Sequence, residues 1–336
     1  MGYGDYPPPS MLGYGPAMSD SKAGNGNPRS PRILIVHNPT AGGSRARAGA
    51  TMVRLRRLGC HIEVRSTARR GDAEAFARAA VGQGFDRVVA AGGDGTINEA
   101  IQGLAGTGLP LALLPLGTAN VLAAEIGLGS EPAVLAETIA RGEPRSICLG
   151  RVRGADGRAR FFTSMVGIGA DAHAVAGINP DLKRLTGKGA YYAEILHQFL
   201  VFPFPYYRVS VEDADYEAVS VVVANGRHYA GDFVLAPDAR LAEPCLHVCL
   251  FEKAGRAAAF RYALAIQQGE LADLPDFRVV TGRKVRIEGP AGDPVQADGD
   301  IVAALPVEIE TVPDALELVM PVDDVTTSPA RIEKEA

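Results

Sequence analysis

The stretch RVVAAGGDGTINEAIQGLAGTGLPLALLPLGTANVLAAEIGL, residues 87–128, decides the fold of this chain. The apolar run 88–91 stops at a glycine pair, which is typical of a buried strand that ends in a turn. From Thr96 onward the apolar residues recur at helical spacing, and Thr96 is the expected cap, three residues before Glu99. Asp94 falls in the turn itself. A strand, a glycine-rich turn and a helix N-terminus together predict an anion site, because glycines let the backbone approach a phosphate closely.

The same pattern repeats immediately downstream. Residues 111–114 form a second apolar run, 115–118 a turn, and a stretch rich in helix formers begins at Ala119. Two such strand ends side by side predict a crevice at the carboxyl edge of a parallel sheet, where open α/β sheets bind their ligands. A phosphorylated ligand is expected there. The alternative is that each glycine cluster is only a turn between a strand and a helix.

Length and composition limit the possible classes of protein. A chain of 336 residues is long enough for two domains, and its 47% hydrophobic and 22% charged residues are ordinary for a globular protein. The net charge of −5 argues against a general nucleic-acid binder. The sequence has no uninterrupted apolar run long enough to cross a membrane.

The chain divides into four segments. Residues 1–31 are dominated by Gly, Pro, Ser and Asn and predict a disordered leader without a secretory signal; Met18 is an alternative start. Residues 32–143 alternate strands and helices, which predicts a doubly wound α/β domain with a parallel sheet. Residues 144–322 are mainly strand-like runs, with single strands expected among others at 160–166, 307–312 and 316–320. They predict an antiparallel β-sandwich, interrupted by helices near 187–200 and 257–268. Residues 323–336 form a tail.

One strand of the second half carries three potential metal ligands. Cys245, His247 and Cys249 alternate with apolar residues, so on a strand they share one face. This spacing permits a zinc hypothesis, but the usual patterns of structural zinc sites are absent. An ordinary half-buried strand is therefore the preferred interpretation.

Six motifs carry a resemblance to a known family. They are HNPTAGG at 37–43, AGGDGTINEAIQGL at 91–104, LPLGTAN at 114–120, GIGADA at 167–172, ANGRHYAGDFVLAPDA at 224–239 and QADGD at 296–300. In this order and rough spacing the chain resembles the diacylglycerol kinase catalytic family over residues 32–322. That family includes bacterial soluble lipid kinases, sphingosine kinases and ceramide kinases.

The resemblance implies ATP and Mg²⁺ as cofactors, an ATP-binding domain at 32–143, a lipid-acceptor domain at 144–322 and an active site in the cleft between them. The nucleotide-contacting positions that match the family are Asn38, Pro39, Thr40, Ala41, Gly42, Thr67, Gly92, Gly93, Asp94, Gly95, Thr96, Ile97, Asn98, Glu99, Gly117, Thr118 and Asn120. Asp171 matches a position that contacts the lipid headgroup. Asp298 and Asp300 match the acidic pair of the family, and Asp94 and Asp300 are the implied Mg²⁺ ligands.

The chemistry of such a kinase requires a base near the acceptor. A lipid hydroxyl is a weak nucleophile, and a carboxylate within hydrogen-bond reach accepts its proton as the bond to the γ-phosphorus forms. Asp298 is the expected base and Asp94 is its rival. Taken without the resemblance, Asp298-Gly299 is a common dipeptide of hairpin turns.

The sequence departs from the family pattern in two places. Val121 stands where many bacterial members have an aspartate, which is closer to the sphingosine kinase branch. In the metal loop at 239–246, Glu243 and Pro244 replace the customary Asp-Gly, which argues against a structural Mg²⁺ there. Diacylglycerol, sphingoid bases and ceramide therefore remain alternative acceptors. The apolar stretch 195–207 is expected either to line an acyl cleft or to be a core helix that runs into an edge strand.

The expected partner is a membrane lipid, reached by peripheral contact of a cytoplasmic protein with the inner membrane face. A homodimer and a monomer both stay open. Two other functions stay open. One is phosphorylation of NAD by an enzyme similar to NAD kinases, and the other is lipid binding by a regulator that has lost its kinase activity.

Overall fold

The computed structural model describes residues 30–41, 45–177, 202–229 and 233–322. By their contacts, residues Pro31–Ala336 belong to one compact unit, and this unit contains every element described below. The expected helix at 187–200, the C-terminal tail and nearly all of the expected leader lie outside the described residues.

Four parallel strands form the expected α/β part, in the order β2-β1-β3-β4. Their bounds are β1 (Arg32–His37), β2 (His61–Ser66), β3 (Arg87–Gly92) and β4 (Leu111–Pro115). The apolar runs of β1, β3 and β4 are almost wholly buried, as expected for strands that are covered on both faces. The carboxyl ends of all four strands consequently lie along one edge of the sheet.

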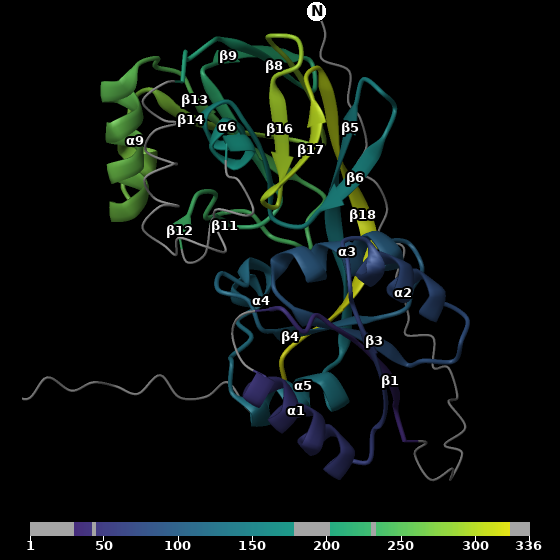
Figure 1. The fold of residues 1–336 in the computed structure, drawn as a ribbon. Coiled ribbons are helices and arrows are strands. Elements are labelled where there is room, and N and C mark those ends of the chain that lie inside the picture. Colours follow the sequence, from purple (N-terminus) through teal and green to yellow (C-terminus); the bar gives the residue numbers. More distant parts are fainter. Residues whose placement is uncertain (1–29, 42–44, 178–201, 230–232, 323–336) are drawn as a thin grey trace, which may run out of the picture. The chain divides into compact units, whose positions relative to one another are not determined.

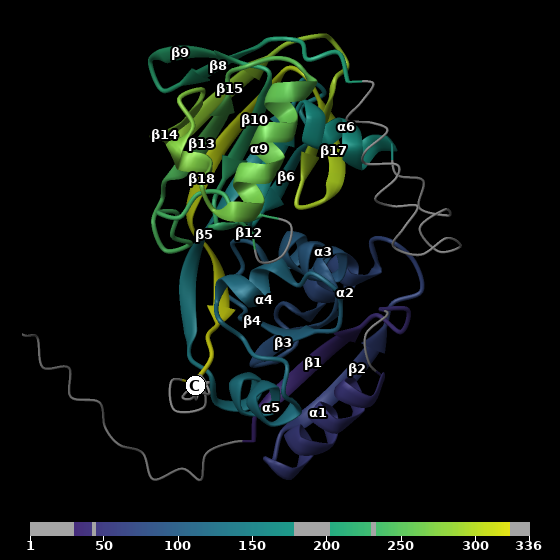
Figure 2. The same cartoon turned by 90° about the vertical axis from the view of Figure 1, so that its left-hand side faces the viewer.

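Five helices cover the two faces of this sheet. They are α1 (Arg45–Arg57), α2 (Asp72–Ala80), α3 (Asp94–Leu104), α4 (Val121–Glu125) and α5 (Pro132–Arg141). Helices α1 and α5 pack together on one face, and α2 and α3 pack together on the other (Figures 1 and 2). The fold is therefore doubly wound, as the alternation of strands and helices predicts.

Two long strands extend this sheet into the β-rich part of the chain. Strand β5 (Pro144–Gly154) pairs antiparallel with β18 (Val307–Val319), which in turn lies parallel to β4 and antiparallel to β15 (Lys284–Glu288). The expectation of two strands at 307–312 and 316–320 is wrong, because one strand covers both runs with a shift of its register against β5 between Val312 and Leu316. A single sheet of ten strands results.

A second, antiparallel sheet packs against the far end of the first. It contains six strands in the order β14-β13-β10-β7-β16-β17. Their bounds are β7 (Met165–Ile168), β10 (Ser220–Ala224), β13 (Leu246–Phe251), β14 (Phe277–Gly282), β16 (Pro294–Ala297) and β17 (Asp300–Ala304). Buried side chains of this sheet share one core with those of β8 (Tyr207–Val211) and β15 in the first sheet. This arrangement is the expected β-sandwich.

The remaining elements border the sandwich. They are β6 (Ala159–Phe162), β9 (Ala214–Ala218), the hairpin β11 (His228–Tyr229) with β12 (Phe233–Val234), α6 (Ala170–Gly177), α9 (Arg256–Gln268) and the short 3₁₀ turn η1 (Leu271–Asp273). Helix α9 confirms the helix expected at 257–268, and it covers a separate apolar cluster on the outside of the second sheet (Figure 1).

Three local expectations are wrong. The single strand expected at 160–166 is broken into β6 and β7, because Thr163 and Ser164 turn their backbone amides toward a distant carboxylate. Helix α3 begins at Asp94 with Gly93 as its cap, so Thr96 lies inside the helix. Strand β13 is buried on both faces rather than half-buried. Within the described ranges, no three His, Cys, Asp or Glu side chains are grouped so as to hold a metal ion.

Candidate functional site

Three turns meet at the carboxyl edge of the parallel sheet. Asn38 follows β1, and its Nδ2 donates a hydrogen bond to the Thr96 hydroxyl in α3 at 3.1 Å. The Asn38 Oδ1 accepts from both the backbone amide and the hydroxyl of Thr40, at 3.0 and 2.9 Å. One asparagine thus fixes its own turn and ties it to the glycine-rich turn that follows β3.

The glycine-rich turns after β3 and β4 touch through their backbones. A Cβ added to Gly117 would lie 2.7 Å from the Cα of Gly93, and one added to Gly93 would lie 3.2 Å from the Cα of Gly117. Any side chain at either position therefore pushes the two turns apart. The glycines are required here by the close approach of two chains, which brings the N-terminus of α3 beside the turn that leads into α4.

Asp94 holds the second turn in place. Its Oδ2 accepts from the backbone amide of Asn120 at 3.0 Å and its Oδ1 from that of Val121 at 2.8 Å. These amides begin α4, so the carboxylate of Asp94 caps a helix that starts 27 residues later. A carboxylate offers about four acceptor positions, and Asp94 uses two of them. Within the described residues its other acceptor positions have no side-chain or backbone donor.

Asp298 lies in the two-residue turn between β16 and β17. Both Asp298 and Gly299 have positive φ, 46° and 86°, as in the tight hairpin turn that the dipeptide predicts. The carboxylate accepts four hydrogen bonds: from the amide and hydroxyl of Thr163 at 2.7 and 3.0 Å, and from the amides of Ser164 and Met165 at 2.9 and 3.0 Å. All of its acceptor positions are occupied.

The environment of Asp298 acts on its pKa in two directions. Burial raises the pKa of this carboxyl, and the four hydrogen bonds oppose that effect, with burial the larger influence. The backbone carbonyl of Asp298 also accepts a hydrogen bond from Nδ2 of Asn98 in α3, at 3.3 Å. The turn that carries Asp298 is thereby attached to α3, the helix whose N-terminus the sequence predicts as an anion site.

Asp300 has a different setting two residues later. Its Oδ1 forms an ion pair with Arg70 at 2.8 Å, and 38% of its side chain is exposed. Arg70 lies in the loop after β2, three residues beyond Thr67. Asp300 is therefore an accessible carboxylate beside the loop that was expected to contact a nucleotide.

The other expected nucleotide positions fall into three groups. Thr67 and Thr118 lie in turns at the same edge of the sheet. Ile97 is 1% exposed in the core, so its side chain is unavailable to a ligand, and Glu99 caps α2 by accepting from the Ala73 amide at 3.1 Å. Pro39 and Ala41 belong to the turn after β1, Gly92 ends β3, Gly95 lies in the first turn of α3, and Gly42 lies outside the described residues.

A second half-buried acid, Asp171, lies in the β-rich part of the chain. Its carboxylate accepts from the Tyr229 hydroxyl at 2.7 Å and from Nε2 of Gln296 at 2.6 Å. Burial raises the pKa of Asp171, and these two hydrogen bonds oppose the effect. The sequence alone did not single out Tyr229 or Gln296, nor Thr163 beside Asp298. Tyr229 and Gln296 lie within two of the six motifs, and that was the available signal.

The metal loop at 239–246 is organised by an arginine. Nη1 of Arg240 donates to the backbone carbonyls of Pro237 and Ala239, at 2.8 Å each. Among the described residues, this loop belongs to no group of three His, Cys, Asp or Glu side chains that could hold a metal ion.

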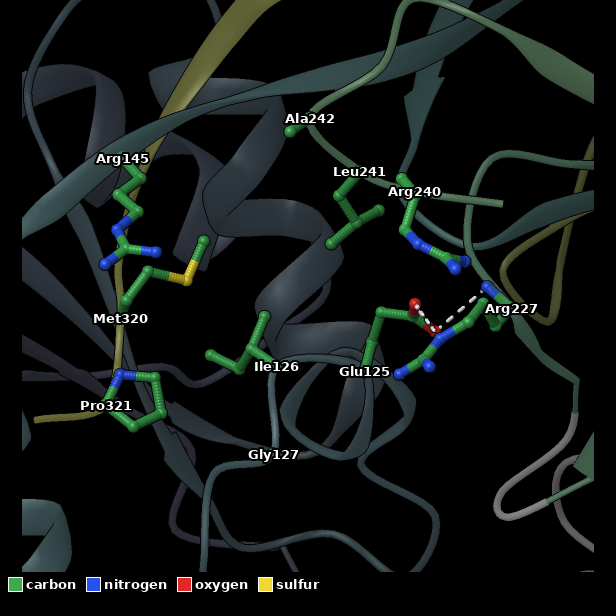
Figure 3. A pocket seen from close by; sticks show the side chains of 10 residues that line it. All are labelled: Glu125, Ile126, Gly127, Arg145, Arg227, Arg240, Leu241, Ala242, Met320 and Pro321. Atoms are coloured by element: carbon green, nitrogen blue, oxygen red, sulfur yellow. Dashed lines mark hydrogen bonds and ion pairs between the residues drawn. The ribbon is translucent and has the colours of Figure 1, made fainter. Parts of the chain in front are cut away.

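A pocket of about 530 Å³ lies at the C-terminal end of α4, where Glu125 and Ile126 line it. Figure 3 shows Arg145 on one side of it, Arg227 and Arg240 on the other, and Glu125 joined to Arg227 by hydrogen bonds. None of these residues belongs to the expected site.

Comparisons with known proteins agree on one family. Residues 32–152 match the model of the diacylglycerol kinase catalytic domain, and residues 164–320 match that of the YegS C-terminal NAD kinase beta sandwich-like domain. A protein named diacylglycerol kinase from Mycobacterium tuberculosis (strain ATCC 25618 / H37Rv) is 29% identical over 300 residues, covering 86% of this chain and 95% of that protein. A "probable lipid kinase YegS-like" from Pseudomonas aeruginosa (strain UCBPP-PA14) is 35% identical over 222 residues, covering 65% of this chain and 71% of that protein.

The fold has solved counterparts as well. The crystal structure of a diacylglycerol kinase from Bacillus anthracis str. Sterne superimposes with a TM-score of 0.68 at 21% identity, covering 88% of this chain and 98% of that one. At this identity the likeness concerns the fold alone. Among the residues that the structure describes, none of the helices is both long and apolar enough to span a membrane.

Proposed function

The chain belongs to the diacylglycerol kinase catalytic family of lipid kinases, and on that premise we propose that it transfers the γ-phosphate of ATP to a hydroxyl of a membrane lipid. The observation that carries the proposal is the contact between the turns after β1, β3 and β4, which gathers two glycine-rich backbones and the N-terminus of α3 at one point. Backbone amides at a helix N-terminus are suited to the phosphates of a nucleotide.

Mg²⁺ is the second proposed cofactor. Asp94 keeps unused acceptor positions beside the phosphate turns, and Asp300 is an exposed carboxylate whose only ion pair within the described residues is with Arg70. Carboxylate oxygens are the ligands that Mg²⁺ prefers. When bound, the ion neutralises charge on the phosphoryl oxygens, and the two aspartates hold it against the nucleotide.

We propose Asp298 as the base, and its contacts indicate how an acceptor reaches it. Three of its four donors are backbone amides, which are fixed by the fold. The fourth is the Thr163 hydroxyl, which leaves the carboxylate by a rotation of one side chain. A lipid hydroxyl that takes this place donates its hydrogen bond to Oδ2 and loses its proton to the same oxygen during transfer. Asp94 remains the rival base.

The acceptor is expected to contact Asp171, which the Tyr229 hydroxyl and the Gln296 amide hold in a fixed orientation. A half-buried carboxylate of this kind recognises a hydroxyl or an amine on the lipid headgroup. The three candidate acceptors, diacylglycerol, sphingoid base and ceramide, all carry hydroxyl groups.

The acceptor lipid resides in a bilayer, and one surface is suited to meet it. On the outer side of α9, Phe260 and Leu264 are 70% and 43% exposed, and on the neighbouring β12 Phe233 and Val234 are both 42% exposed (Figures 1 and 2). Helix α9 has no acidic residue. An apolar, non-acidic helix face is typical of peripheral contact with an anionic membrane surface, and we propose the cytoplasmic face of the inner membrane. Of the stretch 195–207, residues up to 201 lie outside the described residues.

The test is a panel of acceptors. The purified chain is incubated with Mg-ATP and dioctanoylglycerol, sphingosine, a short-chain ceramide or NAD, and the products are identified by mass spectrometry. Phosphorylation of one lipid is the expected result. Phosphorylation of NAD alone would replace the proposal with the second candidate, which the likeness of residues 164–320 to an NAD kinase sandwich favours. Lipid binding without ATP binding would indicate a regulator that has lost its activity.

A further inference from the structure

The pocket at the C-terminal end of α4 contains more positive charge than negative. Its lining includes the guanidinium groups of Arg145, Arg227 and Arg240 and the single carboxylate of Glu125. That carboxylate accepts from the amide and Nε of Arg227, at 3.0 and 3.3 Å, and from the amide and Nδ1 of His228, at 3.0 and 2.6 Å. Glu125 is thus fully engaged and balances only Arg227.

Within the part of the chain that the structure describes, the other two arginines form no ion pair with an acidic side chain. Arg240 is held by the carbonyls of Pro237 and Ala239, which orient its guanidinium without neutralising it. Arg145 forms no ion pair or side-chain hydrogen bond with any residue inside the described ranges. Two positive charges are therefore uncompensated in the lining of a pocket, in a chain whose net charge is −5. An anion is the ligand that such a pocket selects.

The space between the arginines is apolar. Figure 3 shows Ile126, Leu241 and Met320 between Arg145 on one side and Arg227 with Arg240 on the other. Inorganic phosphate alone leaves this surface uncovered. A volume of about 530 Å³ accommodates a phosphate group together with a short apolar body.

The pocket is separate from the nucleotide turns. Asp94 holds the amides of Asn120 and Val121 at the start of α4, whereas Glu125 and Ile126 at its end line the pocket. With five residues, α4 is about 7.5 Å long. A ligand in the pocket and one at the glycine-rich turns therefore contact opposite ends of one short helix.

From these observations we propose that the pocket is a second binding site, for an amphiphile that carries a phosphate monoester. The phosphate pairs with Arg240 beside Arg227, the apolar part lies on Ile126, Leu241 and Met320, and Arg145 contributes attraction from the opposite side. The site is independent of which acceptor the chain phosphorylates, since none of its residues belongs to the proposed active site.

Isothermal titration calorimetry of the full chain tests the proposal with three probes: dioctanoyl phosphatidate below its micellar concentration, inorganic phosphate and neutral dioctanoylglycerol. The phosphatidate is expected to bind at least about tenfold more tightly than either of the others. Arg240→Gln is expected to weaken phosphatidate binding about tenfold or more, because it removes a charge-assisted hydrogen bond, and Arg145→Gln about two- to fivefold. Arg240→Lys, which keeps the charge, is expected to retain part of the affinity.

The matched control is Arg153→Gln, which removes the same charge from an exposed position of β5 outside the pocket. It is expected to bind phosphatidate like the unaltered chain, and all variants are checked for an unchanged melting temperature. Equal binding by the Arg240→Gln and Arg153→Gln variants overturns the proposal, because the phosphatidate then binds elsewhere. If inorganic phosphate binds as tightly as phosphatidate, the apolar part of the ligand contributes nothing and the proposal of an amphiphilic ligand is wrong.

Discussion

Replacing Asp298 by asparagine separates its structural contacts from its proposed chemistry. The carboxylate accepts four hydrogen bonds in a half-buried turn, and an amide of the same shape has only one acceptor oxygen. Two donors of the 163–165 segment then face an NH₂ group. Each buried donor left without an acceptor costs about 1–3 kcal/mol, partly offset because a neutral amide is easier to bury than a charged carboxylate. The expected net loss is about 3 kcal/mol, or roughly 6 °C in melting temperature.

The assay measures melting temperature and turnover on the same preparations. Asp300→Asn is the matched control, since Asp300 is partly exposed and forms one ion pair, which is worth about 0.5 kcal/mol. Thr163→Val removes the one exchangeable donor, so it is expected to cost about 1 kcal/mol while leaving the base intact. An Asp298→Asn variant with an unchanged melting temperature would refute the structural reasoning. One that is folded at the assay temperature and turns over at the normal rate would eliminate Asp298 as the base.

Three further predictions follow from other contacts. Gly117→Ala is expected to destabilise the chain by about 2 kcal/mol and to weaken binding of a fluorescent ATP analogue, because the added Cβ lies 2.7 Å from the Cα of Gly93. The Cβ added by Gly95→Ala meets open space, so that variant is expected to have an equal or higher melting temperature. Burial raises the pKa of Glu125, but the hydrogen bonds from His228 and Arg227 outweigh burial and lower the pKa below the ordinary 4.5. The stabilising effect of the Glu125 carboxylate is therefore complete above pH 4.5 and is lost as the pH falls through the lowered pKa. The difference in melting temperature between the unaltered chain and Glu125→Gln is accordingly expected to shrink as the pH falls below 4.5. The double variant Phe260→Ser/Leu264→Ser is expected to lose sedimentation with anionic vesicles while keeping activity on monomeric dioctanoylglycerol.

Each of these has an outcome that contradicts it. Equal melting temperatures for the two glycine variants would show that the turns do not touch as described. If the difference in melting temperature between the unaltered chain and Glu125→Gln grows as the pH falls, the pKa of Glu125 is not lowered as stated. For the membrane surface, Val53→Ser is the control, since Val53 is 46% exposed on α1. If Val53→Ser loses vesicle binding as completely as the Phe260→Ser/Leu264→Ser variant, α9 is not the surface that contacts the membrane.

The sequence was most informative where the determining interactions are local. Strands β1, β3 and β4 are continuous apolar runs followed by a turn, and the expected elements match the observed ones closely. The hairpin at Asp298-Gly299 was also predicted, because the turn type depends on the two residues that form it.

The failures have long-range causes. The break between β6 and β7 depends on a carboxylate 135 residues away from Thr163. The cap of α4 comes from Asp94, whereas Thr96, which has the pattern of a cap, is tied instead to Asn38. Such hydrogen bonds are set by the tertiary fold, and no periodicity within a window of neighbouring residues contains them. The roles assigned to the aspartates by resemblance remain predictions.

Strand β18 has a consequence for how the chain is synthesised. It begins beside β15 and ends beside β4. The four parallel strands β2-β1-β3-β4 therefore remain unpaired at β4 until residues near 319 have been translated. Until then a ribosome-bound N-terminal half exposes the backbone of β4 as an open edge, a form prone to aggregation. The two halves are thus expected to be insoluble when expressed as separate fragments, and the gene is expected to tolerate neither a split near residue 143 nor an early stop codon.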